Sequence, residues 1–248
     1  MPASGFVDLH SHVVPSGDDG AQTLEEGLEL CALAARHGTR VLYATPHVWP
    51  HLVLTGERER EIWSAFQRFR TRAPLELRLG FELTPTAALL DEDPHRYALE
   101  GIDAVLVEVP FVGSSAILVA VAEHIEAAGL QAVIAHPERT EAVLGAPGEA
   151  QRLAERGWLL QVNSTSLLGR HGSGPEELAW RLVDEGLAAI VASDGHRAAR
   201  PPQLDDAYEL VRARVGEERA LRLFDGSALG LGAASPRPIP SRAAARGA

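Results

Sequence analysis

The sequence contains no lysine, so arginine supplies all 23 of its lysine and arginine positions. Without a lysine amine the chain cannot form a Schiff base or build a Walker-type phosphate loop. It also cannot carry the carboxylated-lysine metal bridge of many barrel amidohydrolases. Arginine, in contrast, presents phosphate with a planar fork of N–H donors. The composition therefore excludes several enzyme classes and is compatible with phosphate recognition.

Cysteine is almost absent as well, because Cys31 is the only one in the chain. A single cysteine excludes intrachain disulfides and fits a reducing cytoplasm. A cysteine-dependent phosphatase would need arginine six positions later, and His37 stands there. Cys31 also falls on the expected apolar stripe of a helix. We therefore reject Cys31 as a nucleophile.

The sequence also lacks long apolar runs and a basic charge balance. No apolar run approaches the roughly 18 residues of a membrane span, and the first residues carry no basic region of a secretory signal. The formal net charge is −11, whereas nucleic acids and anionic membranes require a basic face. We expect a cytoplasmic protein with no nucleic-acid partner and no membrane insertion.

The pattern that is present alternates strands and helices along one domain, residues 1–232. Thr23 to Glu26 predicts a capping box at a helix start, followed by an apolar stripe of Leu24, Leu28, Cys31 and Ala35. Glycine repeatedly joins a helix to an apolar strand, at Gly129, Gly157 and Gly186. Seven such strands predict a closed or nearly closed α/β barrel with parallel strands. Residues 233–248 are rich in Ala, Pro and Arg and are expected to form a disordered tail.

Metal-ligand side chains recur where these strands end. In His10-Ser11-His12, the two imidazoles share one face of a strand because side chains alternate with period two. The other strand ends carry His47, Glu82, Glu108, His136, Asp194 and His196. Since the carboxyl ends of barrel strands meet at one rim, these side chains predict a metal site there.

Several polar residues allow two interpretations. Asp18-Asp19-Gly20 is either an ordinary turn or a loop that brings Asp19 over the site as a ligand. Glu82 and Glu108 could also be solvated loop carboxylates. His51 and His171 lie in polar loops and are interpreted as bystanders or substrate contacts. His37, His95 and His124 are assigned no role.

The chain resembles the polymerase and histidinol phosphatase (PHP) family of metal-dependent phosphoesterases, from about Val7 to about Leu231. Within that family it is similar to the bacterial manganese-dependent protein-tyrosine phosphatases of capsule and exopolysaccharide operons. The resemblance rests on the following segments: DLHSHVVPSGDDG, ATPH, GFEL, LVEVPF, VIAHPER, LQVNSTSLLG and ASDGH, with Arg200-Pro201-Pro202 after the last. Residues Val48 to His51 and the Arg/Ala-rich tail depart from the family pattern. These departures lie outside the ligand-type residues, so we expect them to bear on substrate preference.

The resemblance implies a distorted (β/α)7 TIM-like barrel of the PHP type that holds three divalent ions, Mn²⁺ by preference or Fe or Zn, at the carboxyl ends of its strands. It implies a first ion on His10, His12, Glu82 and Asp194. It implies a second ion that Glu82 shares with Glu108 and His136, and a third on Asp19, His47 and His196. Arg139 and Arg200 match the phosphate-binding arginines of the family.

The function implied is hydrolysis of a phosphotyrosine protein, with a bacterial tyrosine kinase of polysaccharide export as one substrate. A small-molecule phosphatase, such as a histidinol-phosphate phosphatase, is the alternative. Two further alternatives are a catalytically inactive scaffold and an amidohydrolase. The complete ligand set argues against the scaffold, and the missing lysine argues against the amidohydrolase.

Overall fold

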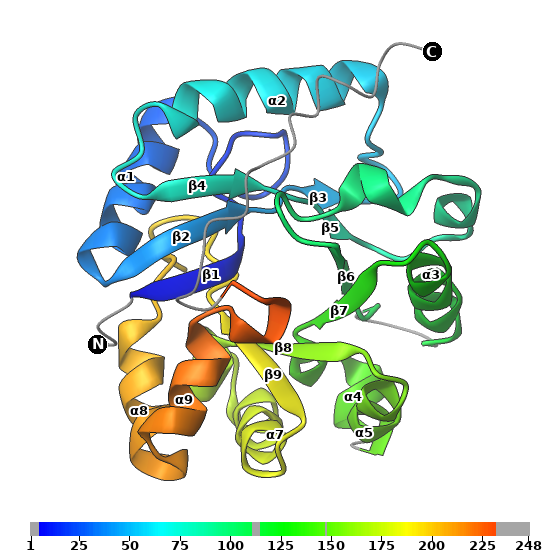
Figure 1. Ribbon diagram of the computed structural model, residues 1–248, viewed down its shortest axis with the longest axis vertical. Coiled ribbons are helices and arrows are strands. Elements are labelled where there is room, and N and C mark those ends of the chain that lie inside the picture. Colours follow the sequence, from blue (N-terminus) through cyan, green and yellow to red (C-terminus); the bar gives the residue numbers. More distant parts are fainter. Residues whose placement is uncertain (1–4, 111–114, 147, 232–248) are drawn as a thin grey trace.

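The computed structural model in Figure 1 describes residues 5–110, 115–146 and 148–231. The predicted tail, residues 233–248, lies outside the described residues. Strands occupy the middle of the molecule and helices lie around them (Figure 1). Within the described residues, none of the helices combines the length and apolar character that crossing a bilayer requires.

All paired strands are parallel and form two sheets. The first has the order β1 (Phe6–Ser11), β2 (Thr39–Ala44), β4 (Glu76–Leu79). The second has the order β3 (His47–Val48), β5 (Glu82–Leu83), β6 (Ala104–Glu108), β7 (Gln131–Ala135), β8 (Leu159–Asn163), β9 (Ala188–Ala192).

Two strands of the predicted set are each interrupted once. The chain passes from β2 to β3 at Thr45-Pro46 and from β4 to β5 at Gly80-Phe81. Pro46 has no N–H to donate to the ladder, which accounts for the first break. The interrupted strands stay paired, because the N–H of Glu82 donates to the carbonyl of Pro46 at 3.2 Å. Counting each as one strand gives the seven predicted strands.

The first and last strands are neighbours. Ser11 and Gly195 form a parallel bridge, and the N–H of Asp194 donates to the carbonyl of His10 at 2.9 Å. The N–H of His12 donates to the carbonyl of Gly195 at 2.7 Å. The structure therefore has the predicted α/β fold with parallel strands in TIM-like order.

The paired strands, with β1 next to β9, form a ring, and the helices of the described residues flank it. They are α1 (Leu24–Arg36), α2 (Gly56–Arg70), α3 (Ala116–Ala127), α4 (Glu141–Leu144), α5 (Gly148–Glu155), α6 (Ser164–Leu167), α7 (Ser173–Asp184), α8 (Asp205–Val215) and α9 (Glu217–Phe224). Short 3₁₀ helices are η1 (Ala87–Asp91), η2 (Pro94–Tyr97), η3 (Pro137–Arg139) and η4 (Ser227–Leu229). The predicted glycine joins are confirmed, since Gly129, Gly157 and Gly186 have φ of 80°, 89° and 77°.

Helix α1 begins as predicted, because the Thr23 side chain accepts a hydrogen bond from the N–H of Glu26. The buried face of α1, however, is rotated about the helix axis relative to the predicted stripe. The buried face consists of Gly27, Leu30, Cys31 and Ala34, while Leu24 and Leu28 are only partly buried. A Cβ at Gly27 would lie 2.0 Å from the carbonyl oxygen of Val13, so the close approach of backbone at Gly27 sets which face packs inward.

The core has two parts. The larger cluster packs helices such as α1, α2 and α8 against the strands. The smaller cluster combines side chains of β1, β2, β6, β7 and β9, which include Leu9, Tyr43, Leu106, Val133 and Ile190. Because these strands come from different sides of the ring, the smaller cluster fills the space that the strands enclose. This packing fixes the strand ends on which the polar residues stand.

Candidate metal centre

The structure brings all nine predicted ligands together at the carboxyl ends of the strands. Eight of them form three overlapping groups whose ligand atoms lie within 4.8 Å of one another: His12, His47 and His196; His10, His12, Glu82 and Asp194; Glu82, Glu108 and His136. The ninth, Asp19, is 60% exposed, and its Oδ1 lies 3.2 Å from Nε2 of His196. His12 and Glu82 each belong to two groups.

The centre of the cluster is one carboxylate oxygen, Oε2 of Glu82. The Nε2 atoms of His10 and His12 lie 3.1 and 3.2 Å from it, and Nδ1 of His47 lies at 2.9 Å. The predicted common face of His10 and His12 is confirmed, because their Nε2 atoms are 3.1 Å apart. All of these side chains except His47 are fully buried, and His47 is 7% exposed.

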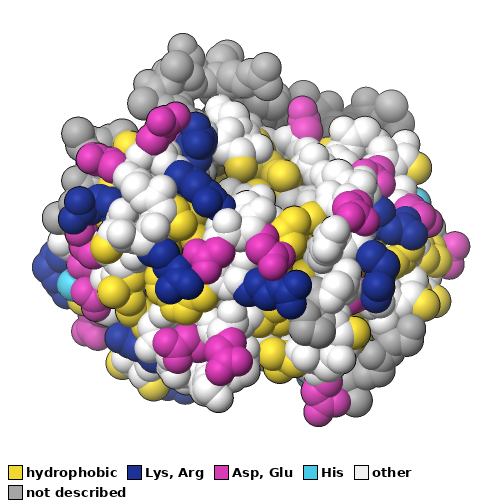
Figure 2. Space-filling model, turned by 90° about the horizontal axis from the view of Figure 1, so that it is seen from below, with side chains coloured by type: hydrophobic (Ala, Val, Ile, Leu, Met, Phe, Trp, Pro, Cys, Tyr) yellow, Lys and Arg dark blue, Asp and Glu magenta, His cyan; other side chains and the backbone are white. Residues whose placement is uncertain are grey.

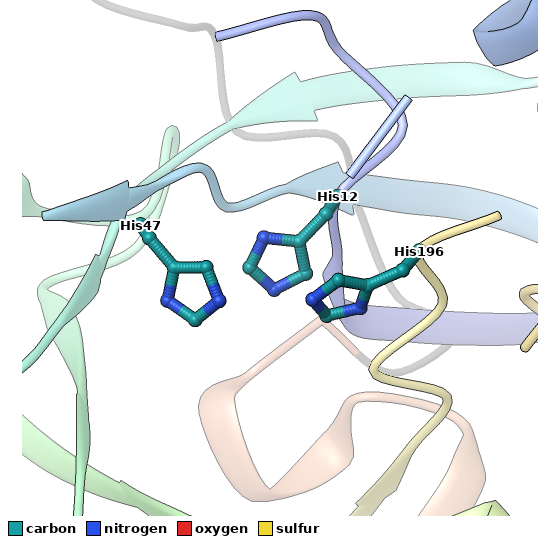
Figure 3. A group of neighbouring side chains, drawn as sticks. All are labelled: His12, His47 and His196. Carbon is teal, nitrogen blue, oxygen red and sulfur yellow. The ribbon is translucent and has the colours of Figure 1, made fainter. Parts of the chain in front are cut away.

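Figure 3 shows three of the histidines turned toward one another from separate segments of the chain. His12 follows β1, His47 begins β3, and His196 follows β9. The ring centroids of His12 and His196 are 3.9 Å apart, and those of His12 and His47 are 4.3 Å apart. Asp19 completes this side of the cluster, since its Oδ1 is 3.5 Å from Nε2 of His47.

The opposite side of the cluster is formed by Glu82, Glu108 and His136. Nε2 of His136 lies 2.9 Å from Oε1 of Glu82. Thr84 donates its hydroxyl to Glu108. Burial and the nearby charge of Glu82 raise the pKa of Glu108 to about 8. Two carboxylates in one dry site repel unless a cation lies between them.

The backbone is strained at two of these positions. Among the described residues, His136 and Asp194 are the non-glycine residues with positive φ, at 33° and 51°. Asp194 is followed by Gly195, where an added Cβ would lie 2.7 Å from Pro202. Strained conformations of this kind persist where the fold holds a side chain in a required direction.

The donor set fits divalent cations. Burial opposes the charge of Glu82, but His10 and His47 outweigh it and hold the pKa of Glu82 well below its usual range. Burial likewise opposes a proton on His10, but Glu82 and Asp194 raise its pKa. Mixed imidazole and carboxylate ligands suit manganese, iron and zinc. These residues could therefore exchange protons for metal ions.

The two predicted phosphate-binding arginines lie beside the cluster on its solvent side. Arg139 donates to Oδ2 of Asp194 at 2.7 Å, and the NH1 of Arg200 lies 3.7 Å from the same oxygen. Their side chains are 18% and 24% exposed, whereas Asp194 is 2% exposed. Arg200 also contacts Nδ1 of His196. Both guanidinium groups therefore stand between the buried carboxylate and the solvent.

Asp18 is a site residue that sequence reasoning missed. Its Oδ2 lies 3.4 Å from Nδ1 of His12 and accepts the N–H of His47 at 3.1 Å. The loop is also a turn, since the N–H of Gly20 donates to Oδ1 of Asp18 at 3.1 Å. The turn is therefore observed, and Asp19 lies beside His47 and His196, while its role as a ligand stays a prediction. Two adjacent carboxylates after the His-x-His pair were the available indication.

The remaining histidines belong to none of the three groups. His51 is exposed and stacks on Trp49, which in turn stacks on His47 with centroids 4.3 Å apart. His171 is hydrogen-bonded to Thr165 at 2.8 Å. Burial and the nearby charges of Arg139 and Arg200 lower the pKa of His171 to about 4.

Parallel strands in TIM-like order with a buried histidine and carboxylate cluster at their carboxyl ends define a barrel protein with a candidate multinuclear metal centre. The chain belongs to the capsular polysaccharide synthesis CpsB/CapC family, whose model matches residues 6–229.

Two relatives illustrate this membership. The chain is 28% identical over 232 residues to the tyrosine-protein phosphatase CpsB of Streptococcus agalactiae, which covers 88% of this chain and 95% of the relative. It is 28% identical over 231 residues to the tyrosine-protein phosphatase YwqE of Bacillus subtilis, covering 90% and 91%.

A solved structure supports the same assignment. It comes from the crystal structures of YwqE from Bacillus subtilis and CpsB from Streptococcus pneumoniae, described as metal-dependent tyrosine phosphatases. The superposition has a TM-score of 0.78 at 25% sequence identity and covers 94% of this chain and 98% of the other.

Proposed function

We propose that this protein is a metal-dependent phosphomonoester hydrolase that removes phosphate from phosphotyrosine in proteins. The family membership and the tyrosine-phosphatase relatives support this reaction class. The observation that carries the proposal is the placement of Arg139 and Arg200 beside a buried cluster of imidazoles and carboxylates. The complete absence of lysine leaves arginine as the phosphate-binding cation.

The nine predicted ligands would hold three divalent ions, Mn²⁺ by preference, with iron and zinc as alternatives. Such ions would lower the pKa of a bound water toward neutrality, so that hydroxide is available near pH ~7. They would also neutralise charge on the phosphoryl oxygens during an in-line displacement. Glu82 would be a ligand at two of the positions, because it belongs to two of the groups and both of its oxygens lie 2.9 to 3.2 Å from imidazole nitrogens. Asp19, the most exposed member, would close the cluster from the solvent side.

The arginines would bind and orient the phosphoryl group. A guanidinium presents N–H donors in a planar fork that matches two phosphoryl oxygens at once, and Arg139 is already held beside the cluster by its hydrogen bond to Asp194. As charge redistributes on the phosphoryl oxygens, donors already held in place stabilise the transition state without reorganisation. A tyrosyl leaving group has a pKa of about 10, so it departs with less protonation than an alkanol requires.

The substrate would be a flexible phosphotyrosine segment of a protein, and a bacterial tyrosine kinase of polysaccharide export is the partner that we propose. The formal charge of −11 disfavours nucleic acid as a partner. The single cysteine is buried, which suits the cytoplasmic location that we propose.

Turnover of a phosphotyrosyl peptide and of histidinol phosphate, each measured with Mn²⁺, tests this function. We expect the peptide to be the better substrate by kcat/KM and both activities to disappear with a chelator. A preference for histidinol phosphate would replace the proposed function with the small-molecule alternative. Undiminished activity in the chelated protein would refute the metal requirement.

A further inference from the structure

Two buried amide side chains link two of the predicted ligands. Gln161 and Asn163 lie two residues apart on β8, so their side chains leave the same face of the strand. Both are fully buried. Oε1 of Gln161 lies 2.9 Å from Nδ1 of His10, and Nε2 of Gln161 donates to Oδ1 of Asn163 at 2.8 Å. Nδ2 of Asn163 then donates to Oδ2 of Asp194 at 2.8 Å.

The donor and acceptor in each hydrogen bond of this series can be deduced from Asp194, the carboxylate at one end. An ionised carboxylate only accepts, so the NH₂ group of Asn163 must face Asp194. The oxygen of Asn163 is then an acceptor, which requires the NH₂ group of Gln161. The oxygen of Gln161 consequently faces His10, and Nδ1 of His10 must carry the proton.

This proton position decides which ring nitrogen of His10 is available to a metal ion. With the proton on Nδ1, the lone pair of neutral His10 is on Nε2. That atom faces Oε2 of Glu82 at 3.1 Å and Oδ1 of Asp194 at 3.4 Å. The series therefore begins and ends on two members of one candidate ligand group.

Further hydrogen bonds hold the backbone of β8 that carries the two amides. The carbonyl of Gln161 accepts the N–H of His136 at 2.8 Å, and the N–H of Asn163 donates to Oε1 of Glu138 at 3.0 Å. Ser166 donates to the same Glu138 oxygen at 2.8 Å. A misplaced amide here would leave a buried polar group unpaired, which is costly.

We propose that Gln161 and Asn163 are positioning residues that fix the Nδ1–H tautomer of His10 and the orientation of Asp194, and thereby strengthen divalent-cation binding. This inference rests on the metal centre of the proposed function. Partners of metal ligands usually change metal affinity by 10- to 100-fold when they are removed.

The test measures Mn²⁺ affinity by chelator competition in the full-length protein. Gln161→Leu removes both hydrogen bonds of the amide, and we expect affinity at one ion position to fall 10- to 100-fold. Asn163→Leu should weaken binding in the same way. Gln161→Glu keeps an acceptor for His10 but cannot donate to Asn163, so it should recover only part of the loss.

Gln131→Leu is the matched control. Gln131 is the first residue of β7, at the end of the strand away from the predicted ligand His136. Its side-chain amide donates to the carbonyls of Ala132 and Gly157. The same chemical change there should leave Mn²⁺ affinity unchanged. A second readout is the Nδ1–H proton signal of His10 in the zinc-loaded protein, identified by its loss in His10→Gln. We expect it in the wild type and in Gln161→Glu, and not in Gln161→Leu.

The outcomes separate this inference from the proposed function. If the wild type binds Mn²⁺ and Gln161→Leu binds it equally well, the positioning role is refuted and the metal centre stands. If the wild type binds no divalent ion, both are refuted. If Gln161→Leu does not fold, equal affinity in Asn163→Leu and the wild type still overturns the inference.

Discussion

Ionic contacts of similar length occur in two contrasting regions of this protein. In the candidate metal centre, His10 and Glu82 lie 3.1 Å apart and are both 0% exposed. On α7, Arg181 and Glu185 lie 2.8 Å apart and are 50% and 43% exposed. Figure 2 shows the face on the side of α7, α8 and α9, where arginines and acidic side chains lie next to one another.

The two regions differ in what holds the charges. Water and salt screen an exposed pair, so removing it changes stability little. A buried charge is tolerated only with several close partners, and removing one partner leaves the others uncompensated. Glu82 has four imidazole nitrogens within 3.2 Å. Such concentration of charge costs stability, which indicates that the cluster serves function.

The largest effect is expected when a predicted ligand is removed. His136→Ala deletes the imidazole that contacts Glu82, and kcat on a phosphotyrosyl peptide should fall at least ~100-fold, because even indirect partners of metal ligands cost 10- to 100-fold. The matched control is His124→Ala, since the His124 ring is hydrogen-bonded to the carbonyl of Glu92 and belongs to none of the three groups. A folded, metal-loaded and fully active His136→Ala protein would show that His136 is no ligand.

A smaller loss is expected at the phosphoryl-binding arginines. Arg139→Ala and Arg200→Ala should each lower kcat/KM by roughly 10- to 1000-fold with little change in metal content. Lysine should not restore activity, because it lacks the planar pair of donors. Arg181→Ala on α7 is the surface control. Near-normal kcat/KM in both arginine variants would mean that phosphate binds without them.

Metal binding should strengthen as the pH rises. The pKa values of His10 and His12 are raised in the metal-free protein, where burial opposes the protonated forms but nearby carboxylates outweigh it. Protons therefore remain on these rings above pH ~6.5 and must leave when a metal binds. Apparent Mn²⁺ affinity should increase by up to ~10-fold per pH unit for each proton released. A pH-independent affinity from pH 6 to 8 would contradict this coupling.

The smallest effect is expected at Cys31, a buried residue outside the cluster. Burial raises the pKa of its thiol to about 12, so it is not a nucleophile at neutral pH. Cys31→Ala should cost about 1 kcal/mol in the free energy of unfolding and leave kcat unchanged. Denaturant titration and peptide kinetics measure the two quantities. A folded but inactive variant would return the cysteine mechanism to consideration.

Strand ends were predictable because six of the seven predicted strands combine an apolar run with a ligand-type residue at or just after the end. This rule identified His47, Glu82 and Asp194, and the structure places all three in one cluster. Apolar runs without alternation predicted the parallel strands. The interruption at Pro46 was not predicted, although a proline cannot donate an N–H to the ladder there.

Supporting residues were harder to predict because their roles depend on contacts between distant segments. Gln161 contacts His10 from 151 positions away in the chain, and no local pattern encodes that contact. Two polar residues on one face of the apolar segment Leu159 to Asn163 were the only indication. Likewise, the buried face of α1 depends on the approach of Val13 to Gly27, which is a tertiary contact.

The central claim is that the nine clustered residues form a metal centre on which phosphotyrosine hydrolysis depends. The most direct test removes metal with a chelator, adds Mn²⁺ back in steps, and follows bound metal and phosphotyrosyl-peptide turnover in the same samples. The account predicts that turnover is lost on stripping and returns as occupancy approaches three ions per chain, one for each group of ligand atoms. Full turnover with at most one bound ion would contradict it.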